Sequence, residues 1–139
     1  MTPQLLAIAL SSIAQFFVGA IWYTPLFGKL WGKIHGFDKL SKKMQDKMIS
    51  KMGPIFAIQI AVTIITATVL VIFHTILPVY SLYVLTLWIW LGFVIPSQVS
   101  GILFSGLDHK WMFTKIAVMA GGSFVSLMSG AAVIIFLLG

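Results

Sequence analysis

Three long stretches without a charged residue constrain the fold of this chain more than any other feature. No Asp, Glu, Lys or Arg occurs within residues 1–28, 52–107 or 116–139. A helix needs about 20 apolar residues to cross the hydrocarbon core of a bilayer, so the outer stretches each hold one crossing and the middle stretch holds two. A soluble domain carries about 25% charged residues, whereas here 9% are charged and 60% are hydrophobic. We therefore predict an integral membrane protein.

Proline, glycine and charged loops place the ends of the predicted helices. Pro3 suits a helix start, Pro25 and Gly28 break the chain after the first helix, and Pro78 marks the turn between the second and third. The predicted fold class is all-α, a polytopic membrane helix bundle of four transmembrane helices with an amphipathic interfacial segment between helices 1 and 2. Residues 1–139 form a single membrane domain, with spans at about 3–23, 54–77, 80–104 and 111–138 and a basic interfacial segment at 26–52.

The segment between the first two spans carries most of the lysines. Four of them recur at every fourth position, each directly before an apolar residue; these are Lys39, Lys43, Lys47 and Lys51. Like charges at this spacing repel one another on a helix in water, but a lysine near anionic lipid gains about 1 kcal/mol. We expect the segment to lie on the membrane surface, with these lysines binding lipid headgroups. A solvated linker helix is the alternative.

One string rich in tryptophan, proline and glycine is specific enough to suggest a family. GAIWYTPLFGKLW resembles the signature of a family of small bacterial membrane proteins known as domain of unknown function 1761, and its characteristic residues here are Gly19, Trp22, Tyr23, Pro25, Phe27, Gly28 and Trp31. GFDKLSKKM, and WLGFVIP followed by ILF in the third span, also resemble this family, so the resemblance covers nearly the whole chain. It implies a four-helix bundle and supplies no reaction or substrate.

The same string has two interpretations. In the structural interpretation, the first span ends in an aromatic belt, and a proline break and a glycine turn lead into the basic segment. In the functional interpretation, these residues form a binding lip at the cytoplasmic mouth of the bundle. The sequence favours the structural interpretation.

The distribution of lysines predicts the orientation and the partners. The loops after spans 1 and 3 are basic, whereas the turn between spans 2 and 3 has no Asp, Glu, Lys or Arg. With the positive-inside rule and the bacterial resemblance, we expect the cytoplasmic (inner) membrane of a prokaryote, a multi-pass chain, and both termini outside. The expected partners are membrane lipids, anionic on the cytoplasmic side, and the protein itself or a larger membrane complex. Nucleic acid is not expected, because the lysines lie beside membrane spans.

Polar side chains recur inside the predicted spans. Gln15, Gln59 and Gln98 each lie well within one, and Ser97 and Ser100 accompany Gln98. An unpaired amide in hydrocarbon costs several kcal/mol, so we expect at least two of the three glutamines to point into the bundle. There they either hydrogen-bond neighbouring helices, for about 0.6–2 kcal/mol each, or line a polar cavity for a substrate.

Small residues at four-residue spacing predict close contacts between helices. Such rows of small residues serve either the bundle itself or a second subunit. Pro96 in the third span also removes a backbone N–H donor and should kink that helix. The residues concerned are Ala7, Ser11, Gln15 and Gly19 in the first span, Gly92, Pro96 and Ser100 in the third, and Gly122, Ser126 and Gly130 in the fourth.

Side chains that could perform chemistry are scarce. The chain has no Cys, and its three acids, Asp38, Asp46 and Asp108, lie in predicted loops. The histidines are scattered without a metal-binding spacing, and no buried base is placed to activate a serine. The sequence therefore assigns no catalytic residue, no metal and no cofactor, and it does not favour an enzyme.

Three functions remain open. The preferred interpretation is a structural or accessory helix-bundle protein that packs with itself or with a larger membrane complex. The alternative is a small carrier or channel for a neutral or apolar molecule, built around the glutamines and Pro96. A lipid-acting membrane enzyme is the second alternative and rests on the basic segment and His109. A continuous wet cavity would favour the carrier, and a dry, well-packed centre would favour the structural role.

Overall fold

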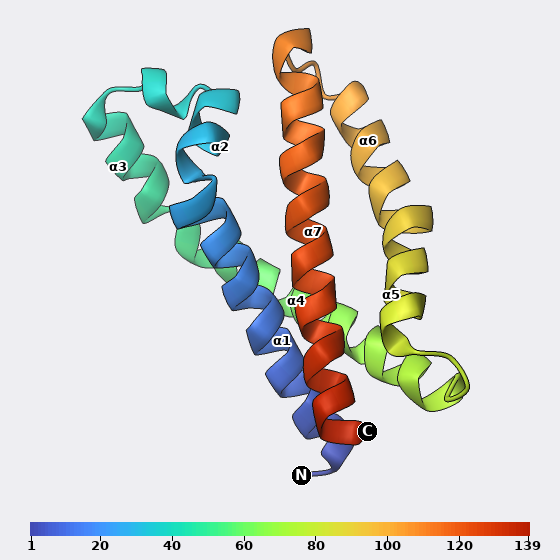
Figure 1. Ribbon diagram of the computed structural model, residues 1–139. Coiled ribbons are helices and arrows are strands. Elements are labelled where there is room, and N and C mark those ends of the chain that lie inside the picture. Colours follow the sequence, from blue (N-terminus) through green and yellow to red (C-terminus); the bar gives the residue numbers. More distant parts are fainter.

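The computed structural model describes residues 1–139 and contains helices, turns and loops but no strand (Figure 1). The helices are α1 (Pro3–Ile21), α2 (Gly28–Ile34), α3 (Lys42–Ser50), α4 (Met52–Ile76), α5 (Leu82–Ile89), α6 (Ile95–Leu103) and α7 (His109–Leu138). Four continuous helical stretches are long and apolar enough to span a membrane, namely Pro3–Leu26, Met52–Ile76, Leu82–Leu103 and His109–Leu138. The predicted all-α fold with four such helices is confirmed.

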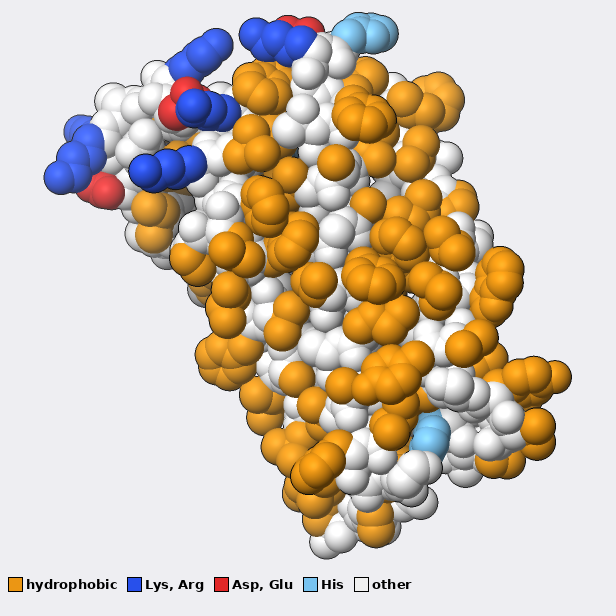
Figure 2. Space-filling view, in the orientation of Figure 1, with side chains coloured by type: hydrophobic (Ala, Val, Ile, Leu, Met, Phe, Trp, Pro, Cys, Tyr) orange, Lys and Arg blue, Asp and Glu red, His pale blue; other side chains and the backbone are white.

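The surface of the molecule fits lipid as its solvent. Only 17 of the 139 residues are buried, and large apolar side chains such as Ile58 (66% exposed), Phe93 (75%) and Phe136 (86%) lie uncovered on the flanks. Lysines and aspartates gather at one end of the bundle, which we call the lysine end, while both chain termini lie at the opposite end (Figures 1 and 2). The apolar flanks and the charged end are what a bilayer and its headgroup layer would contact.

Helix α7 is the centre of the bundle. Helix α1 packs along one side of it, the α5–α6 span packs along the other, and α4 crosses behind α1 and α7 before turning into α5 (Figure 1). The apolar core lies toward the end that holds the termini; it consists of Ala7, Leu70, Val71, Leu82, Ala131 and Ile134. Toward the lysine end α1 and α2 diverge from α7, whereas α6 stays beside it (Figure 1). The bundle is therefore closed at one end and more open at the other.

Two spans contain a π-helical turn, a wider turn than the α-helix, just before or around a proline. The first, η1, covers Trp22–Leu26 and includes Pro25; the second, η3, covers Trp90–Val94 and precedes Pro96. In each turn the tryptophan carbonyl accepts a hydrogen bond from the backbone N–H five residues later. Phe27 N donates to Trp22 O at 2.9 Å, and Ile95 N donates to Trp90 O. The prolines lack an N–H, and the wider turn re-pairs the neighbouring backbone groups.

The first span therefore extends further than predicted. We expected the helix to end near Tyr23 and to break at Pro25, but the helical path continues through η1 to Leu26. A proline in the sequence reveals that one backbone N–H is missing. It does not reveal that the helix will widen into a π-helical turn and continue past it.

The basic segment forms separate short helices. After α2, Gly36 adopts a positive φ of 72°, and a short 3-10 turn covers Phe37–Lys39. Helix α3 then starts at Lys42, because the Ser41 hydroxyl caps it by accepting from Met44 N. The basic segment predicted at 26–52 is thus not one continuous helix. Of the four spaced lysines, Lys43 and Lys47 lie in α3, whereas Lys39 precedes it and Lys51 joins it to α4.

Candidate functional site

A chain of polar groups joins α1 to α7. The side chain of Gln15 is 3% exposed, and its Nε2 donates to Ser11 Oγ at 3.2 Å. Ser11 Oγ donates across the interface to Gly130 O at 3.1 Å, and Ser126 Oγ donates back to Gln15 O at 3.1 Å. These hydrogen bonds hold the two helices together. They open no path for water, because the residues that form them are buried or half-buried.

Glycines of α7 allow this close contact. A Cβ atom at Gly130 would lie 2.6 Å from Gln15 Nε2, and one at Gly121 would lie 2.6 Å from the Trp22 ring. A Cβ at Gly122 would meet the same ring at 2.8 Å. The row predicted on the fourth span, Gly122, Ser126 and Gly130, therefore faces α1. Gly19 and Gly92 have no atom within 4 Å of such a Cβ, so their small size is not needed for a close approach within this bundle.

Three consecutive backbone carbonyls of α7 accept hydrogen bonds from the two neighbouring spans. Trp22 Nε1 donates to Val118 O at 2.9 Å, and Trp90 Nε1 donates to Ala120 O at 3.1 Å and to Ser123 Oγ at 3.0 Å. Between them, Gln98 Nε2 lies 3.5 Å from Met119 O. Trp90 is not among the site residues predicted from the sequence. A signal was available, since in both spans a tryptophan precedes the proline by only a few residues.

The structure does not bring the three glutamines together. Gln15 is buried between α1 and α7, whereas Gln98 is half-buried against α7 and its Oε1 has no hydrogen-bond partner. Gln59 is exposed on α4 and forms no side-chain hydrogen bond. Ser97 and Ser100, which accompany Gln98 in the sequence, are both exposed. Two glutamines thus face α7 from opposite sides, and the third faces outward.

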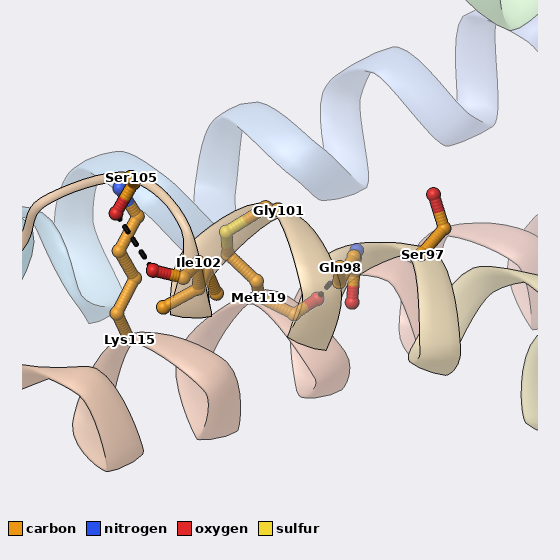
Figure 3. Close-up of a pocket in the computed structure, with 7 residues that line it drawn as sticks. All are labelled: Ser97, Gln98, Gly101, Ile102, Ser105, Lys115 and Met119. Atoms are coloured by element: carbon orange, nitrogen blue, oxygen red, sulfur yellow. Dashed lines mark hydrogen bonds between the residues drawn. The ribbon is translucent and has the colours of Figure 1, made fainter.

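A cleft of about 350 Å³ lies between α6 and α7 toward the lysine end (Figure 3). Its lining residues are Ser97, Gln98, Gly101, Ile102, Ser105, Lys115 and Met119. In Figure 3, Lys115 extends toward Ser105 at one end of the cleft, and Gln98 and Ser97 lie toward the other. A second, apolar hollow of about 500 Å³ is lined by Leu10, Ala132, Val133, Phe136 and Leu137. The two hollows share no lining residue.

Lys115 connects the cleft to the family-like string GAIWYTPLFGKLW, which contains Tyr23 and Trp31. Its Nζ lies 5.6 Å from the centre of the Trp31 ring, a cation–π distance. Trp31 in turn packs edge-on against Tyr23, with ring centres 4.8 Å apart. The cleft is lined by one cation and no acid, and no aspartate lies within ion-pair distance of Lys115. The motif at the end of the first span therefore lies next to the cleft, although the two are far apart in the sequence.

The histidines do not form a metal site. No group of three or more His, Cys, Asp or Glu side chains is placed to hold a metal ion. His35 Nδ1 lies 2.8 Å from Trp31 O, and its ring packs on the ring of Trp31. His109 is exposed at the start of α7, where Asp108 caps the helix by accepting from Lys110 N.

Comparison with known proteins adds one finding. A family model described as "Protein of unknown function (DUF1761)" matches residues 6–136, which is nearly the whole chain. No curated protein and no solved structure matches the chain.

Proposed function

The chain belongs to the family of proteins of unknown function DUF1761, and we propose that it is a structural or accessory membrane protein that packs with itself or with a larger membrane complex. The interface between α1 and α7 carries this proposal. There the buried Gln15 binds Ser11, Ser11 binds the backbone of α7, and the half-buried Ser126 binds the backbone of α1. Polar groups that hold helices together in this way are not available to a solute.

A carrier for a small neutral or apolar molecule is the second candidate, because the cleft between α6 and α7 has polar walls. Alternating access needs a site that opens in turn to each side of the membrane. The cleft lies toward the lysine end, and the apolar core lies toward the other end. A lipid-acting enzyme has less support, since neither His109 nor an acid lines the cleft.

We also propose that the basic segment, residues 26–52, lies on the surface of the membrane. Met44 and Met48 of α3 are 46% and 48% exposed, so the bundle leaves the apolar side of this helix uncovered. An anionic lipid surface would cover these methionines and attract Lys43 and Lys47. By the positive-inside rule, the lysine end faces the cytoplasm of a prokaryote and both termini face outward from its inner membrane.

Native mass spectrometry of the full chain, released from lipid nanodiscs made from its own membrane, tests the packing role. We expect assemblies heavier than the 15.3 kDa chain, made of several copies or of this chain with another membrane protein. A chain that is monomeric over the whole concentration range, and that moves a solute into proteoliposomes, would instead establish the carrier.

A further inference from the structure

We propose that the cleft between α6 and α7 binds the headgroup of an anionic phospholipid, with Lys115 as the cation that recognises its phosphate. This site rests on the membrane location in the proposed function and not on the packing role. The shared chemistry of its ligands is a phosphate group, carried either by a lipid or by a free phosphate.

The depth of Lys115 supports a lipid headgroup. Helix α7 has 30 residues, so it is about 45 Å long at 1.5 Å per residue, whereas the hydrocarbon core is about 30 Å thick. If Leu138 lies near the far boundary of this core, about 20 residues cross it. The turns of α7 before Met119 then stand in the headgroup layer of the lysine end. Lys115 belongs to this part of the helix, at the level where phosphates lie.

The charge of the cleft selects an anion. Lys115 is half-buried and is the one ionisable residue among the seven that line the cleft. It contacts the face of Trp31, which orients the ammonium but leaves its charge without a counter-ion. A partly buried ammonium gains most from a charge-assisted hydrogen bond to an anion such as phosphate.

The remaining polar groups favour a lipid over a free phosphate. Ser105 lies beside Lys115 at one end of the cleft, while Gln98 and Ser97 lie further along it (Figure 3). Gln98 Oε1 has no hydrogen-bond donor, and Gln98 Nε2 makes only the 3.5 Å contact to Met119 O. A phosphate alone would occupy the end with Lys115. A lipid whose phosphate lies at Lys115 also brings ester carbonyls, one level deeper in the membrane, that can accept from Gln98 Nε2.

Lys110 provides a matched control for Lys115. Both lysines lie on α7 near its start, and each ammonium lies over a tryptophan ring, Lys110 at 5.7 Å from the centre of Trp111. Lys110 does not line the cleft. A general attraction of lipid to positive charge would therefore affect both lysines alike, whereas a site in the cleft depends on Lys115.

Native mass spectrometry of the full chain with phosphatidylglycerol, phosphatidylcholine or inorganic phosphate tests the site. We expect the chain to retain phosphatidylglycerol over phosphatidylcholine. Lys115→Gln should lower this retention by roughly tenfold, as the loss of one charge-assisted hydrogen bond implies. Lys110→Gln should leave it unchanged, and Lys115→Arg, which keeps the cation, should retain the lipid. Circular dichroism of each variant checks that it is folded.

Three outcomes would overturn the site. These are equal losses in Lys110→Gln and Lys115→Gln, equal retention of both lipids by the native chain, and binding of inorganic phosphate without retention of lipid. The same spectra report the number of chains in each complex. Lipid bound to a strictly monomeric chain would support the cleft while contradicting the packing role, so the two proposals fail separately.

Discussion

Trp22 and Trp90 occupy equivalent places in two different spans. Each begins a π-helical turn, each donates its indole N–H to a backbone carbonyl of α7, and the two acceptors, Val118 O and Ala120 O, are two residues apart. The wide turn and the indole bond occur together on both sides of α7. A single short stretch of one helix thus fixes the positions of the two spans that flank it.

Removing either indole donor should destabilise the bundle. We expect Trp22→Phe and Trp90→Phe each to cost about 1 kcal/mol, the value of one interhelical hydrogen bond in a membrane, and to lower the unfolding temperature in detergent. Trp88→Phe is the control, because Trp88 is 66% exposed and makes no such bond. A decrease of the same size in Trp88→Phe would show that the loss of ring size, and not of the donor, matters.

The contact between Gly130 and Gln15 should not tolerate an added methyl group. Gly130→Ala would place a Cβ 2.6 Å from Gln15 Nε2, and overpacking of this kind costs about 1–3 kcal/mol. Gly19→Ala, which meets nothing within 4 Å, should instead be neutral or stabilising, since alanine is the better helix former. Thermal unfolding of the two variants tests this difference, and adding Gln15→Ala should restore the stability of Gly130→Ala. If the double variant is no more stable, the steric explanation is wrong.

Replacing the three glutamines by leucine should separate their roles. Gln15→Leu removes a buried bond to Ser11 and should lower stability by about 1 kcal/mol, and Gln98→Leu should have a smaller effect because its contact is long. Gln59→Leu should stabilise the protein in bilayers, because it removes an exposed amide from hydrocarbon. Unfolding in nanodiscs measures all three. A destabilised Gln59→Leu variant would mean that a partner covers this residue.

Lysines of the basic segment should set the preference for anionic lipid around the bundle. Replacing Lys39, Lys43, Lys47 and Lys51 together by Gln should abolish the enrichment of phosphatidylglycerol near the full chain in mixed vesicles, because each lysine contributes about 1 kcal/mol near an anionic surface. Spin-labelled lipids report this enrichment. An unchanged enrichment would identify the segment as a solvated linker.

Single cysteines can test the orientation without background, because the chain has none. Ser41 lies at the lysine end and Ser81 in the turn before α5, and both are exposed. We expect Ser41→Cys to react with an impermeant maleimide only after the cells are opened, and Ser81→Cys to react in intact cells. Labelling of both cysteines in intact cells would exclude the proposed orientation.

The sequence predicted the spans because hydrocarbon imposes a length and excludes charge, and both properties can be read from residue order. Rows of small residues predicted the facing sides of the first and fourth spans, but nothing in the sequence predicted the inner side of the second. In α4, the residues from 54 to 62 are all apolar except Gln59, so no amphipathic pattern distinguishes the inner from the outer face of this helix. Soluble helices show such a pattern, whereas a helix in lipid is apolar all round.

The cleft and the hydrogen bonds of the two tryptophans were also not predicted from the sequence. The residues that line the cleft come from α6, the following loop and α7, and which of their side chains face one another depends on how the two helices pack. The contact between Lys115 and Trp31 joins residues 84 positions apart, and no sequence pattern relates them. The π-helical turns depend on which backbone groups pair, and side-chain identity does not determine this pairing beyond the position of a proline.

The central position of α7 has a consequence for biosynthesis. The ribosome delivers α7 after the other three spans, yet it carries the carbonyls that Trp22 and Trp90 bind and the glycine against which Gln15 packs. Until α7 enters the membrane, the two indole N–H groups lack their acceptors, and the earlier spans lack the helix around which they assemble. Insertion and assembly are therefore separated in time. The insertion machinery, or lipid at its exit, has to accommodate two spans whose indole N–H groups are still without these acceptors.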